Sequence, residues 1–132
     1  MDNPIVACAF GVACFVAGYV TMRFLKDRWR THKLADMLRQ VEAARALTYE
    51  LAYRVMHRLG DPQALVARTS LAKVQATQAM QFCADQAVQL LGGMGFMRGT
   101  QSERIYREVK VMMIGGGSEE VMKDLAARQL GL

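Results

Sequence analysis

Apolar side chains recur every three to four residues over a long stretch, from Thr31 to Leu59, that contains neither glycine nor proline. This spacing places them on one face of an α-helix, whereas a half-buried strand would alternate apolar and polar side chains. The apolar positions are Leu34, Met37, Leu38, Val41, Ala44, Leu47, Leu51, Val55 and Leu59. Only two prolines occur in the 132 residues. The sequence therefore predicts an all-α fold.

Turn-forming residues mark the next helix. Gly60 suits the position just past a helix end, and Asp61 followed by Pro62 suits an N-cap with proline in the first turn. The third helix is then expected to run to about Leu91. One of its faces is a seam of small residues, which lets a neighbouring helix approach closely: Ala72, Ala76, Ala79, Cys83 and Ala87.

Two glycine runs divide the rest of the chain. Residues 92–95 cannot comfortably continue a helix, and a short helix is expected over residues 101–112. The second run, residues 115–117, leads to Ser118, which suits an N-cap of a final helix ending near Gln129. We expect an up-and-down bundle of three long helices and two short ones.

The first part of the chain, residues 1–30, allows two interpretations. Residues 4–22 are almost all apolar and carry no charge, so as a helix they are long enough to cross a bilayer. The basic residues that follow would then lie in the cytoplasm. The segment is, however, rich in Ala, Gly and Cys and lacks Leu, which favours a buried first helix of the bundle. The charges follow the apolar segment, unlike those of a signal peptide.

Composition disfavours several classes of function. The net charge is +5, but the basic residues are interspersed with acidic ones, which is not typical of a nucleic-acid-binding face. His32 and His57 lie far apart in sequence, so no metal site is expected. The three cysteines have no metal-like spacing and suit small core residues of a cytoplasmic protein.

The two glycine turns are the candidate site. Backbone amides exposed at helix ends can meet an anionic or planar polar ligand, and Gln89 could add an amide group. Neither turn is a phosphate loop, since no G-K-[ST] follows, and no strand precedes them as in a dinucleotide-binding fingerprint. The alternative is that both turns serve only as helix caps.

Three motifs resemble those of the acyl-CoA dehydrogenase family, in the same order and spacing. Residues 89–96 resemble its Q-x-x-G-G-x-G-[YF] turn, and residues 102–108 resemble its V-E-R-x-Y-R-D helix. Residues 114–121 resemble its closing I-x-x-G-[TS]-x-E-[IV] motif, and residues 32–36 resemble the start of its second bundle helix. The resemblance runs from about residue 32 to the end, so we divide the chain into residues 1–30 and a C-terminal helical bundle of residues 31–132.

The resemblance implies a flavoprotein of fatty acid metabolism. In the family a carboxylate removes the proton alpha to an acyl-CoA thioester, a hydride leaves the beta carbon for FAD, and FAD binds across a subunit interface in a tetramer. By resemblance Gly117 would contact the substrate. The residues that would contact the dinucleotide of a neighbouring subunit are Gln89, Leu90, Leu91, Gly92 and Gly93. Those that would lie near the chain's own flavin are Ser118, Glu119 and Glu120.

The sequence departs from the family at the catalytic base. The usual glutamate position is Gly116, and the other position that the family uses, on the first helix, would fall on Asp2. The family's R-x-x-F-G is absent from residues 23–30, and its N-terminal helical and middle β domains are missing. We therefore expect a homo-oligomer or a partner chain with the missing domains. The alternatives are a non-catalytic helical interaction module and a membrane-anchored helical protein.

Overall fold

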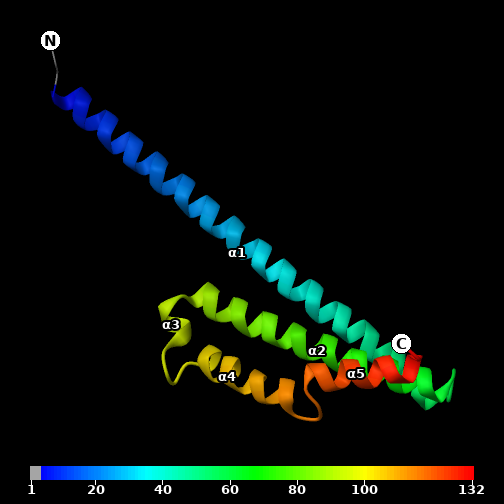
Figure 1. Cartoon of the computed structure of the whole chain (residues 1–132). Coiled ribbons are helices and arrows are strands. Elements are labelled where there is room, and N and C mark those ends of the chain that lie inside the picture. Colours follow the sequence, from blue (N-terminus) through cyan, green and yellow to red (C-terminus); the bar gives the residue numbers. More distant parts are fainter. Residues whose placement is uncertain (1–3) are drawn as a thin grey trace. The chain divides into compact units, whose positions relative to one another are not determined.

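The computed structural model describes the backbone of residues 4–132 and the side chains of residues 26–132. The chain divides into two units, Met1–Ala35 and Asp36–Leu132. Figure 1 shows the helices in chain order, and the described residues form helices and turns only. The expected all-α fold is confirmed, and the second unit contains the bundle.

The first helix, α1, extends over Pro4–Met56, so the expected break between a first and a second helix does not occur. The reason is local, because no glycine or proline lies between residues 19 and 56 to end the helix. In the first unit, the Thr31 hydroxyl donates to the Asp27 carbonyl at 2.9 Å, and Lys33 Nζ lies 4.8 Å from the centre of the Trp29 ring.

The proposed burial or membrane insertion of residues 4–22 falls on side chains outside the described residues. Where side chains are described, from residue 26 onward, none of the helices combines the length and apolar character that a bilayer crossing requires.

The second helix, α2, covers Pro62–Leu91 and begins as the sequence predicts. The Asp61 carboxylate accepts a hydrogen bond from the Ala64 amide at 2.8 Å, and Pro62 occupies the first helical position. Between α1 and α2, Arg58 and Gly60 adopt positive φ angles of 51° and 95°. Two features thus form the corner: a left-handed turn and a capped helix start.

Three shorter helices pack on α2: α3 (Gly93–Phe96), α4 (Gln101–Ile114) and α5 (Glu119–Leu130). Figure 1 shows α4 and α5 following one another along the length of α2. The small-residue seam of α2 allows this close packing, since Ala72 and Ala79 are buried. The main buried apolar cluster joins α2 to α4 through Ala84, Val109 and Met113.

In the second unit, the apolar face of α1 is mostly uncovered. Leu51 is buried, but the side chain of Leu38 is 62% exposed and that of Val55 is 57% exposed. Between α1, α2 and α4 lies an apolar groove of about 510 Å³, whose walls include Met37, Val41, Ala76, Cys83 and Ile105. The described chain therefore covers little of the apolar face that the helical periodicity predicts.

Candidate functional site

The first glycine turn folds back tightly on the end of α2. Gly92 ends α2 with φ 63°, and the Gly95 amide donates to the Gly92 carbonyl at 2.8 Å. Gly95 is buried, and a Cβ there would lie 2.8 Å from both Leu91 Cβ and the Val88 carbonyl oxygen. Only glycine lets the turn approach α2 so closely.

Hydroxyl groups join this turn to α4. The buried Ser102 hydroxyl donates to the Gly95 carbonyl at 2.8 Å. Thr100 caps α4, since its hydroxyl oxygen accepts a hydrogen bond from the Glu103 amide at 3.4 Å. The first turn is therefore held from two directions, by α2 and by α4.

The residues predicted from the resemblance at the first turn share one end of α2. Gln89, Leu91, Gly92 and Gly93 are exposed, and Leu90 is half-buried. A Cβ at Gly92 or Gly93 would meet nothing within 4 Å, so the space beside this backbone is open. The backbone of this turn is therefore accessible from the surface.

The second glycine turn connects α4 to α5. The Gly115 amide donates to the Val111 carbonyl at 2.8 Å, and the Gly117 amide donates to the Ile114 carbonyl at 3.2 Å. Gly116 and Gly117 have φ angles of 72° and 116°, which side chains rarely tolerate. A Cβ at Gly117 would overlap the side chain of Met122, whereas a Cβ at Gly116 would meet nothing within 4 Å. The position of the family's usual glutamate thus faces open space.

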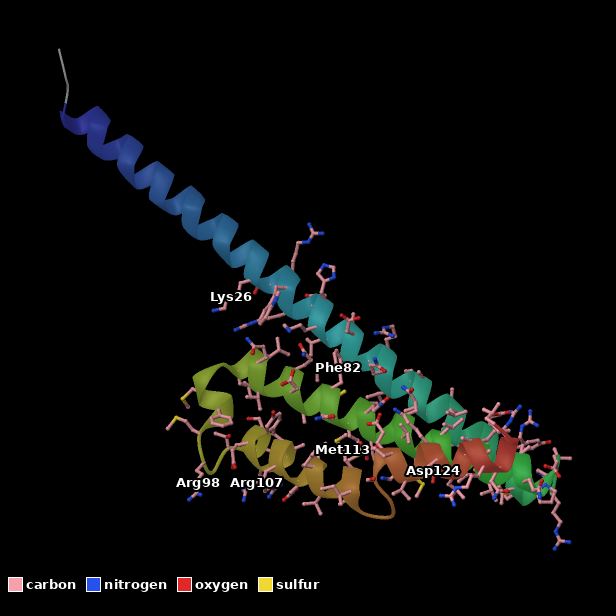
Figure 2. All side chains as sticks on the ribbon, viewed as in Figure 1. Lys26, Phe82, Arg98, Arg107, Met113 and Asp124 are labelled. Atoms are coloured by element: carbon pink, nitrogen blue, oxygen red, sulfur yellow. The ribbon has the colours of Figure 1, made fainter. Side chains whose placement is uncertain are left out.

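Side chains of α2 bind this turn and the start of α5. Lys73 Nζ donates to the Met113 carbonyl at 2.9 Å and to the Gly117 carbonyl at 2.5 Å. Gln78 Nε2 donates to a carboxylate oxygen of Glu119 at 2.8 Å, and Lys123 forms an ion pair with the same oxygen. The carboxylate of Glu119 is therefore engaged within the chain. Figure 2 shows Met113 where α4 faces α2.

The N-terminus of α5 carries the remaining predicted residues of this turn. Ser118 is the N-cap, and its hydroxyl oxygen accepts from the Val121 amide at 3.5 Å. Hydrogen bonds from its own backbone amide and from Ser118 lower the pKa of the exposed Glu120 carboxyl. The helix start therefore carries an ionised carboxylate at the surface, next to the positive end of the helix dipole.

The chain does not bring the two turns together. They lie at opposite ends of α4, whose 14 residues span about 21 Å at 1.5 Å per residue. Each turn is thus a separate position on the surface, and both are bound to α2 (Figure 1).

Catalytic groups are not assembled at either turn. Gly116 supplies no carboxylate, and Asp2 lies outside the described residues. Across the described part of the chain, no group of three or more His, Cys, Asp or Glu side chains is arranged to hold a metal ion.

Sequence patterns did not single out Lys73 or Ser102. The carbonyl partners of Lys73 lie 40 and 44 residues further along the chain, and that of Ser102 lies seven residues back. A carbonyl group belongs to every residue, so a side chain that binds one leaves no residue-type signal in the sequence.

Comparisons with known proteins agree with the motifs. The model of the family described as "Acyl-CoA dehydrogenase, C-terminal domain" matches residues 21–131. The mitochondrial short-chain specific acyl-CoA dehydrogenase of Sus scrofa is 34% identical over 98 residues, which are 74% of this chain and 23% of that protein. The acryloyl-CoA reductase (NADH) of Anaerotignum propionicum is 33% identical over 97 residues, which are 74% and 24% of the two chains.

A solved structure gives the same result. A crystal structure described as an acyl-CoA dehydrogenase from Mycobacterium smegmatis superimposes with a TM-score of 0.71 and 39% sequence identity, over 76% of this chain and 26% of that one. The chain spans about a quarter of the length of the curated relatives that it matches.

Proposed function

The chain belongs to the acyl-CoA dehydrogenase family, and on that premise we propose that it supplies flavin contacts to an α,β-dehydrogenase of acyl-CoA thioesters. One observation carries the proposal. Two of the family's glycine motifs form exposed turns, and α2 binds both of them through specific contacts. Lys73, Gln78 and the close approach of Gly95 hold the two turns in fixed positions on α2.

At the first turn, we propose that residues 89–93 contact the dinucleotide part of FAD bound mainly by a neighbouring subunit. The exposed side chain of Gln89 can both donate and accept hydrogen bonds. The open space beside Gly92 and Gly93 lets a planar or phosphorylated group reach the backbone.

At the second turn, we propose that Ser118 and Glu120 lie near the flavin of the chain's own site, with Gly117 beside the acyl-CoA. The Ser118 hydroxyl accepts from the Val121 amide and hydrogen-bonds to the Glu120 carboxylate, so these two residues form one polar group at the start of α5. Because the Glu119 carboxylate is bound by Gln78 and Lys123, the proposed contribution of Glu119 is its backbone.

In this proposal, the described residues bind the reactants, and a residue elsewhere in the assembled protein removes the proton. When bound, FAD would accept the hydride that leaves the beta carbon of the acyl chain. The residues of the two turns would bind and orient the flavin and the acyl-CoA. Gly116 has no side chain that could act as the catalytic base. We propose that the proton alpha to the thioester passes to a carboxylate elsewhere, either Asp2 or a residue of another part of the assembled protein.

Residues 1–30, most of which lie in α1, belong to the same proposal as a segment that is buried in the assembled protein, in the cytoplasm. A membrane anchor is the alternative. Deleting residues 1–22 distinguishes the two, since only an anchored protein would move from the membrane fraction to the supernatant.

The test is the visible absorption spectrum of this chain after desalting, with and without FAD and with a second chain that carries the family's other domains. We expect flavin absorbance to be retained in the mixture. Replacing Gln89 with Ala should weaken retention, whereas Gln81→Ala, an exposed glutamine elsewhere on α2, should not. A colourless mixture, or equal retention by both variants, would contradict the proposal.

A second candidate is a non-catalytic oligomerisation module. It is favoured by large exposed apolar side chains outside the turns, including Leu38 at 62% and Val111 at 66% exposed. It predicts a stable oligomer without flavin. Sedimentation analysis of the flavin-free chain, and of a Val111→Asp variant that should dissociate it, tests this candidate.

A further inference from the structure

Lys73 combines three features that set it apart from the surface lysines. It lies in the middle of α2, it is only half exposed, and its ammonium binds two backbone carbonyls. By contrast, Lys123 pairs with a carboxylate one helical turn away on its own exposed face.

The two carbonyls belong to the end of α4 and to the turn that follows. The last carbonyls of any helix lack partners within the helix. Here the Gly115 and Gly117 amides bind the carbonyls of Val111 and Ile114, and Lys73 binds the carbonyl of Met113. A positive charge at a helix C-terminus also meets the negative end of the helix dipole. Lys73 therefore completes the cap of α4.

The contact with the Gly117 carbonyl holds a part of the backbone that would otherwise be free to move. Gly116 and Gly117 have no side chains to restrict them, and glycine samples more conformations than any other residue. The Gly117 carbonyl belongs to the peptide group whose nitrogen is the amide of Ser118. Fixing the Gly117 carbonyl therefore also fixes the direction of the Ser118 amide.

We propose that Lys73 is the positioning residue of the second glycine turn. Its ammonium holds the peptide group between Gly117 and Ser118 in the orientation that presents the start of α5 to a ligand. The link to flavin rests on the proposed function, whereas the effect on the turn does not. Gln78 and Glu119 hold the start of α5 independently, so loss of Lys73 should free residues 115–118 without detaching α5.

Hydrogen–deuterium exchange of the chain tests whether Lys73 holds the second glycine turn. Lys73→Met keeps the length and apolar stem but removes the donors, and it should speed exchange at residues 115–118 about tenfold or more. Lys73→Arg, which can still donate to both carbonyls, should restore most of the protection. Lys26→Met, a control that removes an exposed lysine of α1 outside the candidate site, should leave the turn unchanged.

Unchanged exchange in Lys73→Met would overturn the inference, and so would an equal increase over α2, which would indicate general destabilisation. If Lys73→Met does not fold, Lys73→Ala, which also lacks the donors, replaces it, with the same expected and overturning results.

Flavin retention, measured with a second chain that carries the family's other domains, tests whether Lys73 affects FAD binding. We expect the dissociation constant for FAD to rise about tenfold in Lys73→Met, to recover in Lys73→Arg and to stay constant in Lys26→Met. A turn that exchanges faster while FAD binding is unchanged would overturn the link to the site. Failure of the unmodified chain to retain FAD would instead overturn the proposed function, and the exchange result would still decide the role of Lys73.

Discussion

Replacing Gly95 with Ala should destabilise the bundle by a steric effect alone. The added Cβ would lie 2.8 Å from the Val88 carbonyl oxygen, 2.8 Å from Leu91 Cβ and 3.1 Å from Val88 Cα. These atoms belong to the last turns of α2 and cannot rotate away as a side-chain tip can. Overpacking of this kind costs about 1–3 kcal/mol, and the gain in helix propensity from glycine to alanine offsets about 0.5–1 kcal/mol of it. We expect a net loss of about 1–2 kcal/mol in the free energy of unfolding.

Gly93→Ala is the matched control, because Gly93 lies in the same short helix and a Cβ there would meet nothing within 4 Å. It should be neutral or slightly stabilising. Thermal unfolding followed by circular dichroism measures both variants, and the Gly95→Ala midpoint should fall by about 4–8 °C, at about 4 °C per kcal/mol. Equal midpoints for the two variants would refute the argument that the close approach of the first turn to α2 requires glycine.

Three further changes test other parts of the two turns. Gly116→Glu places a carboxylate in open space but puts a side chain at a positive φ angle, so the protein should lose about 1 kcal/mol of stability. Mixed with a chain that carries the family's other domains, this variant should gain dehydrogenation of acyl-CoA in a dye-reduction assay. Ser102→Ala leaves the Gly95 carbonyl without its buried donor and should cost about 1–2 kcal/mol in urea unfolding; no loss would contradict that hydrogen bond. The pKa of the Glu120 carboxyl is lowered in the folded chain. The ionised carboxylate therefore stabilises the fold above the pKa that Glu120 has in the unfolded chain, and this stabilisation is lost as the pH falls through its pKa in the folded chain. An NMR titration of the carboxyl with a midpoint at or above the ordinary glutamate value would refute this.

The parts of the fold that depend on local signals could be predicted from the sequence. Asp61 and Ser118 cap the helices that they were expected to cap, because an N-cap bonds to an amide only three residues away. The break expected in the region of residues 23–30 was wrong, since nothing there stops a helix from continuing.

Long-range contacts could not be predicted. Periodicity showed that α1 has an apolar face, but it could not show that Leu38 and Val55 would remain exposed, since burial depends on what other elements cover them. In the candidate site, the glycine turns were visible in the sequence because their composition is unusual. The contacts of Lys73 were not, since they join a common side chain to backbone groups far along the chain.

The separation of the two turns by the length of α4 has a genetic consequence under the proposed function. Each chain would contribute one edge to its own flavin and a different edge to a neighbour's. Two inactive chains, one damaged only at the first turn and one only at the second, would then restore one intact flavin site when they assemble side by side. Co-expression of Gln89→Ala with Ser118→Ala would recover flavin that neither variant retains alone. Two copies of either variant cannot do so, because every site in such an assembly contains the same defect.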